Sequence, residues 1–484
     1  MRLIIFGVFL CLTQSSYGFF GYTRKYNNHE EPFLPHTNRI LLINPKTIGE
    51  KWIEQRLDHF NPQDERKWMM RYFENDEHYI PNGPIFIYVG GEWSISAGSI
   101  SAGSHIYDLA KEHNGILFYT EHRYYGKSHP TTNTSTENLR FLNIDQALAD
   151  LAFFINHIKS RSSDLTNSRV IMVGGSYSAT MVAWMRKKFP HLVTGSWASS
   201  APLEALLDFY EYKEVMTNAI KLVGGDECAE TFKNAFKEME HLVEIGETRR
   251  LHLAFNLCSS LDLTQDIPHF FYELSDIVAG LVQGHRPGNI ERACDYMKDQ
   301  KETLDKDELD AFAAWIRKGS WTCLDMSYQN NVIKFTNIEW GSEANRQMRQ
   351  WIYQTCSEFA WFQTSTSKNQ IFGTTYPVDY FLKLCQDLYD NSFNLTTIEQ
   401  NIARTNTFYG ALKLSLTNVF FTHGGLDPWH PTGILEDLNE STPVVVLPLN
   451  AHVSDLGQIS SYDSPELKAT KEKIQELVRQ WLNE

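Results

Sequence analysis

The chain has 484 residues, of which 42% are hydrophobic and 13% aromatic, with 28 glycines and 17 prolines that follow no period. This composition is typical of a globular protein with a buried core, and it excludes collagen, coiled-coil and low-complexity classes. The formal net charge of −15 repels a phosphate backbone, so we predict no nucleic-acid partner.

The N-terminus has the pattern of a secretory signal peptide. Met1-Arg2 precedes an apolar run from Leu3 to Leu12, and small residues lead to a predicted cleavage site after Gly18. The run is shorter than the ~20 apolar residues that cross a bilayer, so we predict secretion without a membrane anchor. After this signal peptide (1–18), the polar and aromatic stretch 19–50 is predicted to be a leader or pro-segment.

The next part of the chain, 51–201, predicts a parallel β-sheet with helices on its faces. Short apolar or β-branched runs at 85–89, 116–120 and 170–173 are typical of buried strands. Between the last two runs, residues 143–158 place apolar side chains at helical spacing. This alternation of strands and helices favours an α/β fold with a parallel sheet.

The stretch 202–405 has helical periodicity and contains every cysteine that remains once the signal peptide is removed. In an oxidising compartment these cysteines predict three disulfides within one sub-domain, with their connectivity left open. Strand patterns return at 419–422 and 444–447, and a helix follows at 465–482. We therefore predict an α/β sheet domain, completed by 406–484, that is interrupted by a disulfide-linked and mostly helical insertion.

Two further patterns concern modification and metals. Asn-x-Ser/Thr sequons predict glycosylation at Asn133, Asn394 and Asn439. The sequence contains neither a CxxC nor an HExxH pattern, so we predict no metal site and no cofactor.

Ser176 is the candidate nucleophile. It lies in the turn between the predicted strand at 170–173 and a helix, where small neighbours lift a serine out of the sheet, as in the G-x-S-x-G elbow. Gly174 occupies the first glycine position of this motif, but Ser178 stands at the second. An ordinary tight turn between a strand and a helix is the alternative interpretation.

Asp427 and His452 are the candidate partners of that serine. Each follows a late predicted strand, and they come after Ser176 in the order Ser, Asp, His that this chemistry uses in an α/β fold. Taken alone, the aspartate fits a simple turn residue and the histidine an ordinary surface or core residue. The backbone N–H groups of Tyr177 and Gly91 are the predicted oxyanion donors, with a plain glycine-rich turn as the alternative for Gly91.

Seven segments together resemble the prolyl carboxypeptidase family of serine peptidases, from about Lys51 onward. The resemblance implies an α/β-hydrolase domain with a helical cap, and a catalytic triad of Ser176, Asp427 and His452. The segments are Leu57-Asp-His-Phe60, Tyr88-Val-Gly-Gly-Glu-Trp93, Glu121-His-Arg-Tyr-Tyr-Gly-Lys-Ser128, Gly174-Gly-Ser-Tyr177, Ala198-Ser-Ser-Ala-Pro202, Tyr353-Gln-Thr-Cys-Ser-Glu358 and Asp427-Pro-Trp429.

The same resemblance implies a substrate class. Members of the family act as exopeptidases on the carboxyl side of proline, of the dipeptidyl peptidase or Pro-X carboxypeptidase type. The proline pocket would then include Trp429 and Trp361, while Glu92 and Glu358 are candidates to hold a substrate amine. We interpret most other aromatic residues of the insertion, including Trp351, as core packing. The implied disulfides join Cys228 to Cys294, Cys258 to Cys323, and Cys356 to Cys385.

We therefore expect a secreted or lysosomal serine exopeptidase whose partners are peptides with proline near one terminus. An esterase or lipase on the same fold is one alternative, since a fold does not define a substrate. A non-catalytic secreted binding protein that kept the fold is another. A homodimer formed through the insertion is kept as an alternative to a monomer.

Overall fold

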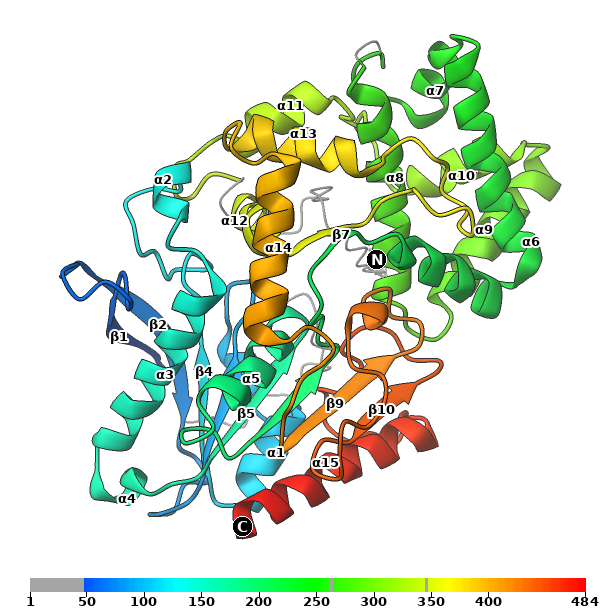
Figure 1. Cartoon of the computed structure of the whole chain (residues 1–484). Coiled ribbons are helices and arrows are strands. Elements are labelled where there is room, and N and C mark those ends of the chain that lie inside the picture. Colours follow the sequence, from blue (N-terminus) through cyan, green and yellow to red (C-terminus); the bar gives the residue numbers. More distant parts are fainter. Residues whose placement is uncertain (1–47, 262–263, 344–346) are drawn as a thin grey trace, which may run out of the picture.

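The computed structural model describes residues 48–261, 264–343 and 347–484, so the predicted signal peptide and most of the predicted leader lie outside it. Its main feature is one sheet with the strand order β1-β2-β4-β3-β5-β6-β9-β10 (Figure 1). The antiparallel strands β1 and β2 form one edge, and the remaining six strands are parallel. The strands are β1 (Glu50–Arg56), β2 (Lys67–Asn75), β3 (Ile85–Val89), β4 (Ile116–Thr120), β5 (Val170–Gly175), β6 (Gly195–Ser199), β9 (Val419–Gly424) and β10 (Val444–Leu447).

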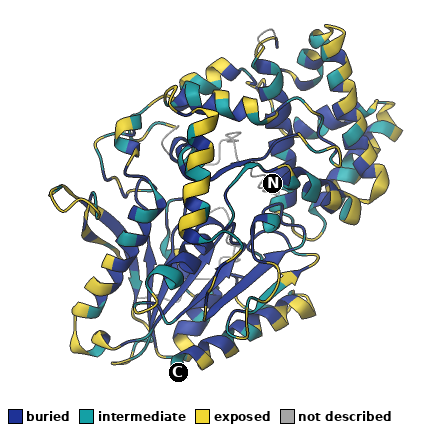
Figure 2. Ribbon diagram, viewed as in Figure 1, coloured by how far each residue is buried: buried dark blue, intermediate teal, exposed yellow. Residues whose placement is uncertain are grey.

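Helices cover both faces of this sheet, as the strand and helix alternation predicts. On one face, Ile85 and Ile87 share a core with α3 (Ile144–Ser160) and α5 (Tyr177–Lys188). On the other face, the intervening Phe86 packs in a second core with α1 (His105–Glu112) and α15 (Pro465–Asn483). The central strands are therefore apolar on both sides and buried, while exposed residues lie on the outer surfaces of the helices (Figure 2). Short helices are α2 (Thr136–Leu139) and α4 (Ser163–Thr166), and the 3₁₀ turns are Ala97–Ile100 and His430–Thr432.

The chain between β6 and β9 forms a mostly helical insertion, which we call the cap. Its strands β7 and β8 pair in parallel as a separate two-stranded sheet, and α14 runs from the cap toward the sheet domain (Figure 1). There Tyr409 stacks on Trp184 of α5 at 4.0 Å between ring centroids. The cap elements are β7 (Leu206–Asp208), α6 (Glu211–Glu244), α7 (Thr248–Phe255), α8 (Asp266–Gln283), α9 (Asn289–Leu304), α10 (Glu308–Ile316), α11 (Tyr328–Phe335), α12 (Met348–Gln354), a π-helical turn (Thr355–Phe359), β8 (Ala360–Phe362), α13 (Val378–Leu388) and α14 (Leu395–Tyr409).

Three disulfides lie within the cap. They join Cys228 to Cys294, Cys258 to Cys323, and Cys356 to Cys385, which are the pairs that the family resemblance implies. Disulfides of this kind are typical of proteins that fold in an oxidising compartment.

Two other sequence features are located by the structure. Of the predicted glycosylation sites, Asn394 and Asn439 are exposed and Asn133 is half-buried. Within the described ranges, no helix combines the length and the apolar character that a membrane-spanning segment needs.

Candidate active site

Ser176 occupies a sharp turn between β5 and α5. Its φ of 59° and ψ of −134° lie in a region that L residues rarely adopt, which is where strained turns at functional sites are found. A Cβ atom on Gly174 would lie 2.3 Å from the carbonyl oxygen of Ser178, so this position accepts only glycine. The turn therefore has the backbone of a nucleophile elbow, with the serine at the carboxyl end of its strand.

Ser178 replaces the second glycine of the elbow motif without opening the turn. Its Oγ accepts a hydrogen bond from the Gly175 N–H at 2.9 Å and donates to the Gly175 carbonyl at 2.8 Å. The side chain thus satisfies both polar groups of the residue that precedes Ser176. This explains how the sequence departs from the motif while the elbow conformation is retained.

Asp427 and His452 meet at the carboxyl ends of β9 and β10. The Nδ1 atom of His452 lies 2.7 Å from Oδ2 of Asp427, and both side chains are inaccessible to solvent. The close approach of the two loops needs glycine, since a Cβ on Gly424 would lie 2.3 Å from the Asn450 carbonyl oxygen.

The charge of Asp427 is maintained despite its burial. Burial alone would raise the pKa of this carboxyl, but attraction to His452, its hydrogen bond and the Trp429 N–H bring the pKa below the usual value. A carboxylate that accepts from Nδ1 leaves Nε2 of a neutral imidazole as the atom that can take a proton.

Ser176 and the residue that follows His452 are anchored to adjacent residues at the end of β6. The Ser176 N–H donates to the Ser199 carbonyl at 2.9 Å, and the Val453 N–H donates to Ser200 Oγ at 3.0 Å. A Cβ on Gly175 would lie 3.0 Å from Cγ1 of Val453, so the elbow packs directly on the loop of His452. The structure therefore brings the three candidate triad residues to one edge of the sheet.

The candidate oxyanion donors lie at the same edge. Tyr177 is the first residue of α5, and Gly91 follows β3, which is the parallel neighbour of β5 in the sheet. A Cβ on Gly91 would lie 2.6 Å from the ring of Trp93, so the backbone here is closely covered. Two backbone N–H groups from neighbouring strand ends are the arrangement that acyl-transfer sites use.

An aromatic wall connects the elbow with the loop of Asp427. Trp361 meets Trp429 edge to face at 5.6 Å and stacks on Trp351 at 6.0 Å, and Trp351 contacts Tyr177 at 5.8 Å. Both Ala360 and Trp361 have a φ of 53°, a costly conformation that fixes the position of Trp361. The interpretation of Trp351 as core packing is confirmed, since this residue is buried within the main hydrophobic core, where it forms the middle of the wall. The pocket role of Trp361 and Trp429 stays a prediction.

The two candidate acidic residues have different surroundings. Glu358 accepts hydrogen bonds from the Ile144 N–H at 3.0 and 3.2 Å, so its carboxyl group binds the N-terminus of α3, while burial raises its pKa to about 8. Glu92 is only 9% exposed, and its Oε2 has no hydrogen-bond partner within the described part of the chain. Of the two, Glu92 is the one with a buried carboxyl oxygen that no hydrogen bond within the described residues satisfies.

A buried polar network joins the nucleophile's neighbour to the cap. The Gln354 side chain donates to the Tyr177 hydroxyl at 2.8 Å and accepts from Tyr125 at 2.6 Å. His122 lies 3.3 Å from the same Tyr177 hydroxyl. Three of the segments that carry the family resemblance therefore contact one another. No local pattern predicts this network, because its members are far apart along the chain.

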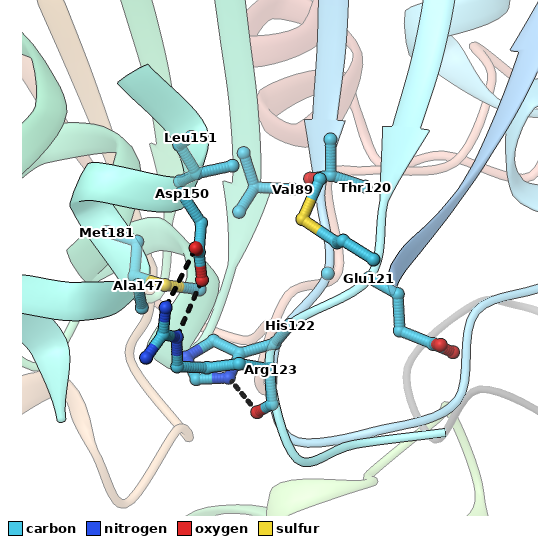
Figure 3. A pocket seen from close by; sticks show the side chains of 11 residues that line it. Val89, Thr120, Glu121, His122, Arg123, Ala147, Asp150, Leu151 and Met181 are labelled. Atoms are coloured by element: carbon cyan, nitrogen blue, oxygen red, sulfur yellow. Dashed lines mark hydrogen bonds and ion pairs between the residues drawn. The ribbon is translucent and has the colours of Figure 1, made fainter. Parts of the chain in front are cut away.

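A small internal cavity of about 10 Å³ lies away from the triad, between the sheet and α3 (Figure 3). Its wall includes Arg123 and Asp150, which form an ion pair, while the Glu121 side chain points away from it (Figure 3). This volume holds about one water molecule, so the cavity is no substrate pocket.

The titration of Glu92 makes the free energy of unfolding depend on pH, and the sign of this dependence follows from the shift of its pKa. Burial raises the pKa of its carboxyl from 4.5 to about 7, so between these values the folded state keeps a proton that the unfolded state releases. Because the folded state then binds more protons, the free energy of unfolding falls as the pH rises through this window.

Glu92→Gln removes this titration and preserves the size of the side chain. Relative to wild type, we expect the variant to gain about 3 kcal/mol of stability between pH 4.5 and about 7, since one pKa unit corresponds to ~1.4 kcal/mol. Chemical denaturation at several pH values measures this difference, with the exposed Glu137→Gln as the matched control. If the difference in free energy of unfolding between Glu92→Gln and wild type did not change with pH, the prediction would be wrong.

The strand order, the elbow after β5 and the cap between β6 and β9 together define an α/β-hydrolase. Within that class, residues 55–474 match the family described as serine carboxypeptidase S28, and the chain belongs to this family. It is a serine-type peptidase.

Individual relatives agree with this assignment. The chain is 32% identical to the thymus-specific serine protease of Mus musculus over 448 residues, which cover 90% of this chain and 87% of the relative. It is 27% identical to the lysosomal Pro-X carboxypeptidase of Homo sapiens over 472 residues, covering 93% and 92%. Among solved structures, a proline iminopeptidase of Mycobacterium smegmatis aligns with a TM-score of 0.36 at 11% identity, covering 86% of this chain and 95% of that one.

Proposed function

We propose that this chain is a secreted or lysosomal serine exopeptidase that cleaves peptides on the carboxyl side of proline. The observation that carries the proposal is the hydrogen bond of His452 to the buried Asp427 beside the Ser176 elbow. The three disulfides, and the word lysosomal in the name of one relative, support a destination on the secretory pathway.

Each catalytic group has one role in the proposed reaction. Ser176 Oγ attacks the carbonyl carbon of the proline residue, while His452 Nε2 takes the hydroxyl proton. The N–H groups of Tyr177 and Gly91 bind the oxyanion. His452 then gives the proton to the leaving nitrogen, the C–N bond breaks, and an acyl-enzyme ester remains. A water molecule that loses a proton to His452 hydrolyses this ester and releases Ser176.

The aromatic wall supports proline as the residue before the cleaved bond. Trp361 and Trp429 meet edge to face at 5.6 Å, and Trp429 lies two residues after Asp427, so flat apolar rings line this side of the candidate triad. A pyrrolidine ring is flat, apolar and uncharged, so such a surface selects it by burial.

Two types of exopeptidase fit this arrangement. They differ in the free terminus that the substrate must have. A dipeptidyl peptidase needs an acidic group for the free amine. Glu92 is the candidate, since its Oε2 has no hydrogen-bond partner among the described residues and its carboxyl is charged above a pKa of about 7. A Pro-X carboxypeptidase instead recognises the free carboxylate, which is the activity named for one relative.

A serine-reactive fluorophosphonate tests the nucleophile. We expect stoichiometric labelling of the wild type at Ser176, and Ser176→Ala should lose the label together with about 10⁶-fold in kcat, as in other serine peptidases. Thermal unfolding of the variant provides the control for folding. Labelling that persists in Ser176→Ala would show that another residue is the nucleophile, and a folded wild type that never reacts would favour the non-catalytic binding protein.

Digestion of two peptide series tests the substrate class. One series is X-Pro-Y with a free amine, the other is an N-blocked peptide that ends in Pro-Y, and mass spectrometry identifies the products between pH 4 and 8. Release of X-Pro only from free-amine peptides identifies a dipeptidyl peptidase, and release of Y from the blocked series identifies a carboxypeptidase. Cleavage of neither series, with turnover of p-nitrophenyl esters, would favour the esterase alternative.

A further inference from the structure

The last residue of the cap helix α8 lies between the two loops that carry Asp427 and His452. The backbone carbonyl of Gln283 accepts a hydrogen bond from the His452 N–H at 3.2 Å. The last carbonyls of a helix have no partner within the helix, so this contact uses a group that α8 leaves available.

The side chain of Gln283 contacts the other loop. Its Oε1 accepts from Trp429 Nε1 at 3.0 Å and from the Tyr212 hydroxyl at 2.9 Å. An indole N–H only donates, so the atom that faces it must be the amide oxygen, and the orientation of the Gln283 amide is thereby defined. Tyr212 also meets the Trp429 ring edge to face at 5.5 Å, so both cap helices α6 and α8 hold this tryptophan.

These contacts close a ring of hydrogen bonds. The indole N–H of Trp429 donates to Gln283 Oε1, and the backbone N–H of Trp429 donates to Asp427 Oδ1 at 3.0 Å. Asp427 Oδ2 accepts from His452 Nδ1, and the backbone N–H of His452 donates to the Gln283 carbonyl, which closes the ring. Three members belong to the sheet domain, and Gln283 alone comes from the cap.

We propose that Gln283 is a positioning residue that couples the cap to the triad by holding the loops of Asp427 and His452 in a fixed position relative to each other. This inference rests on the proposed function of Ser176 and its partners. The ring closes only while α8 lies against both loops, so the imidazole is held in place when the cap covers the substrate. In addition, the C-terminal end of α8 faces His452, and the partial negative charge of a helix C-terminus favours the positive imidazole that forms during the reaction.

Gln283→Leu tests the proposal because it replaces the amide with an apolar group and so removes both acceptor contacts of the side chain. We expect kcat on a cleaved peptide to fall by about 10- to 100-fold with KM changed less than about 3-fold, since small misplacements of catalytic groups have effects of this size. The rate of inactivation by a small fluorophosphonate should fall by a similar factor, because that reagent reports on the serine and histidine without using peptide subsites.

Two further variants separate positioning from general stability. Gln283→Glu keeps an oxygen that accepts from Trp429 and Tyr212, and it should restore both rates to within about 3-fold of wild type. The matched control is Gln300→Leu, which changes a buried glutamine of the cap whose side chain accepts from Lys306 instead of contacting the catalytic loops. Its rates should stay within about 2-fold of wild type.

Several outcomes would overturn the proposal. A rise in KM with unchanged kcat and unchanged inactivation rate would assign Gln283 to substrate binding. Equal losses in Gln283→Leu and Gln300→Leu would indicate a general effect on the cap. If Gln283→Leu does not fold, Tyr212→Phe removes one donor to the same oxygen, and unchanged rates in that variant would overturn the proposal. Failure of the proposed function is distinguished from these cases because the wild type itself would then remain unlabelled at Ser176.

Discussion

Asp427→Asn is expected to lower kcat by about 10⁴-fold in a protein that remains folded. The Trp429 N–H donates to Oδ1 of this side chain, so the oxygen of an asparagine keeps that contact and its NH₂ group faces His452. An NH₂ group donates, which forces Nδ1 of His452 to accept and moves the ring proton to Nε2. In that tautomer, His452 has no lone pair with which to take the Ser176 proton.

Asp455→Asn is the matched control for this substitution. Asp455 is also buried, lies three residues after His452, and accepts from Trp197 Nε1 at 3.1 Å and from Ser199 Oγ. Its substitution should affect stability more than kcat, because its partners are residues of the sheet. Steady-state kinetics on one peptide, with thermal unfolding of both variants, measures the difference. Equal losses of kcat in two folded variants would contradict the assignment of Asp427 as the orienting carboxylate.

The order of elements along the chain could be predicted from the sequence, and the candidate triad could be proposed from it, for the same reason. Buried parallel strands are continuous apolar runs, and the helix at 143–158 has a clear period, which agrees with α3 at Ile144–Ser160. Active-site loops follow the carboxyl ends of such strands, so Ser176, Asp427 and His452 could be proposed from their places after predicted strands.

Contacts between distant segments carried no such signal. Gln283 lies 146 residues from Trp429, and nothing in its surroundings along α8 distinguishes it from an ordinary helix-end residue. The positive φ of Trp361 is equally hidden, because it depends on the π-helical turn before it and on a hydrogen bond from its indole to the Glu204 carbonyl at 2.7 Å. Local patterns predict elements, whereas tertiary contacts select which side chains complete a site.

A segment that carries the family resemblance can also have a structural role, and Glu121–Ser128 is an example. Arg123 is fully buried and binds Asp150 through Nε at 2.6 Å and Nη2 at 2.8 Å. Its Nη1 donates to the carbonyls of Leu57 and Phe141. The guanidinium therefore connects α3 to the loops around β1 and β4 and does not take part in the proposed reaction.

Arg123→Met is expected to lower the free energy of unfolding by about 3–5 kcal/mol, because it leaves the buried Asp150 carboxylate without its main partner. The double variant Arg123→Met/Asp150→Leu should recover much of this loss, since removing both charges eliminates the unpaired group. Arg161→Met is the matched control, because Arg161 forms its ion pair with Glu74 at 2.6 Å but its side chain is 33% exposed. That substitution should cost at most about 1 kcal/mol.

Denaturant midpoints, with the slope of each transition, measure all of these variants. If Arg123→Met and Arg161→Met were equally destabilising, the buried pair would contribute no more than a surface pair, and the structural account of this motif would be wrong. If Arg123→Met remained stable but lost fluorophosphonate labelling, the motif would act on catalysis instead. We expect stability to be lost and labelling of the folded fraction to be retained. Arg123 bonds to Asp150 and to the Leu57 carbonyl, whereas Ser176 and Val453, the residue after His452, are anchored to Ser199 and Ser200 at the end of β6.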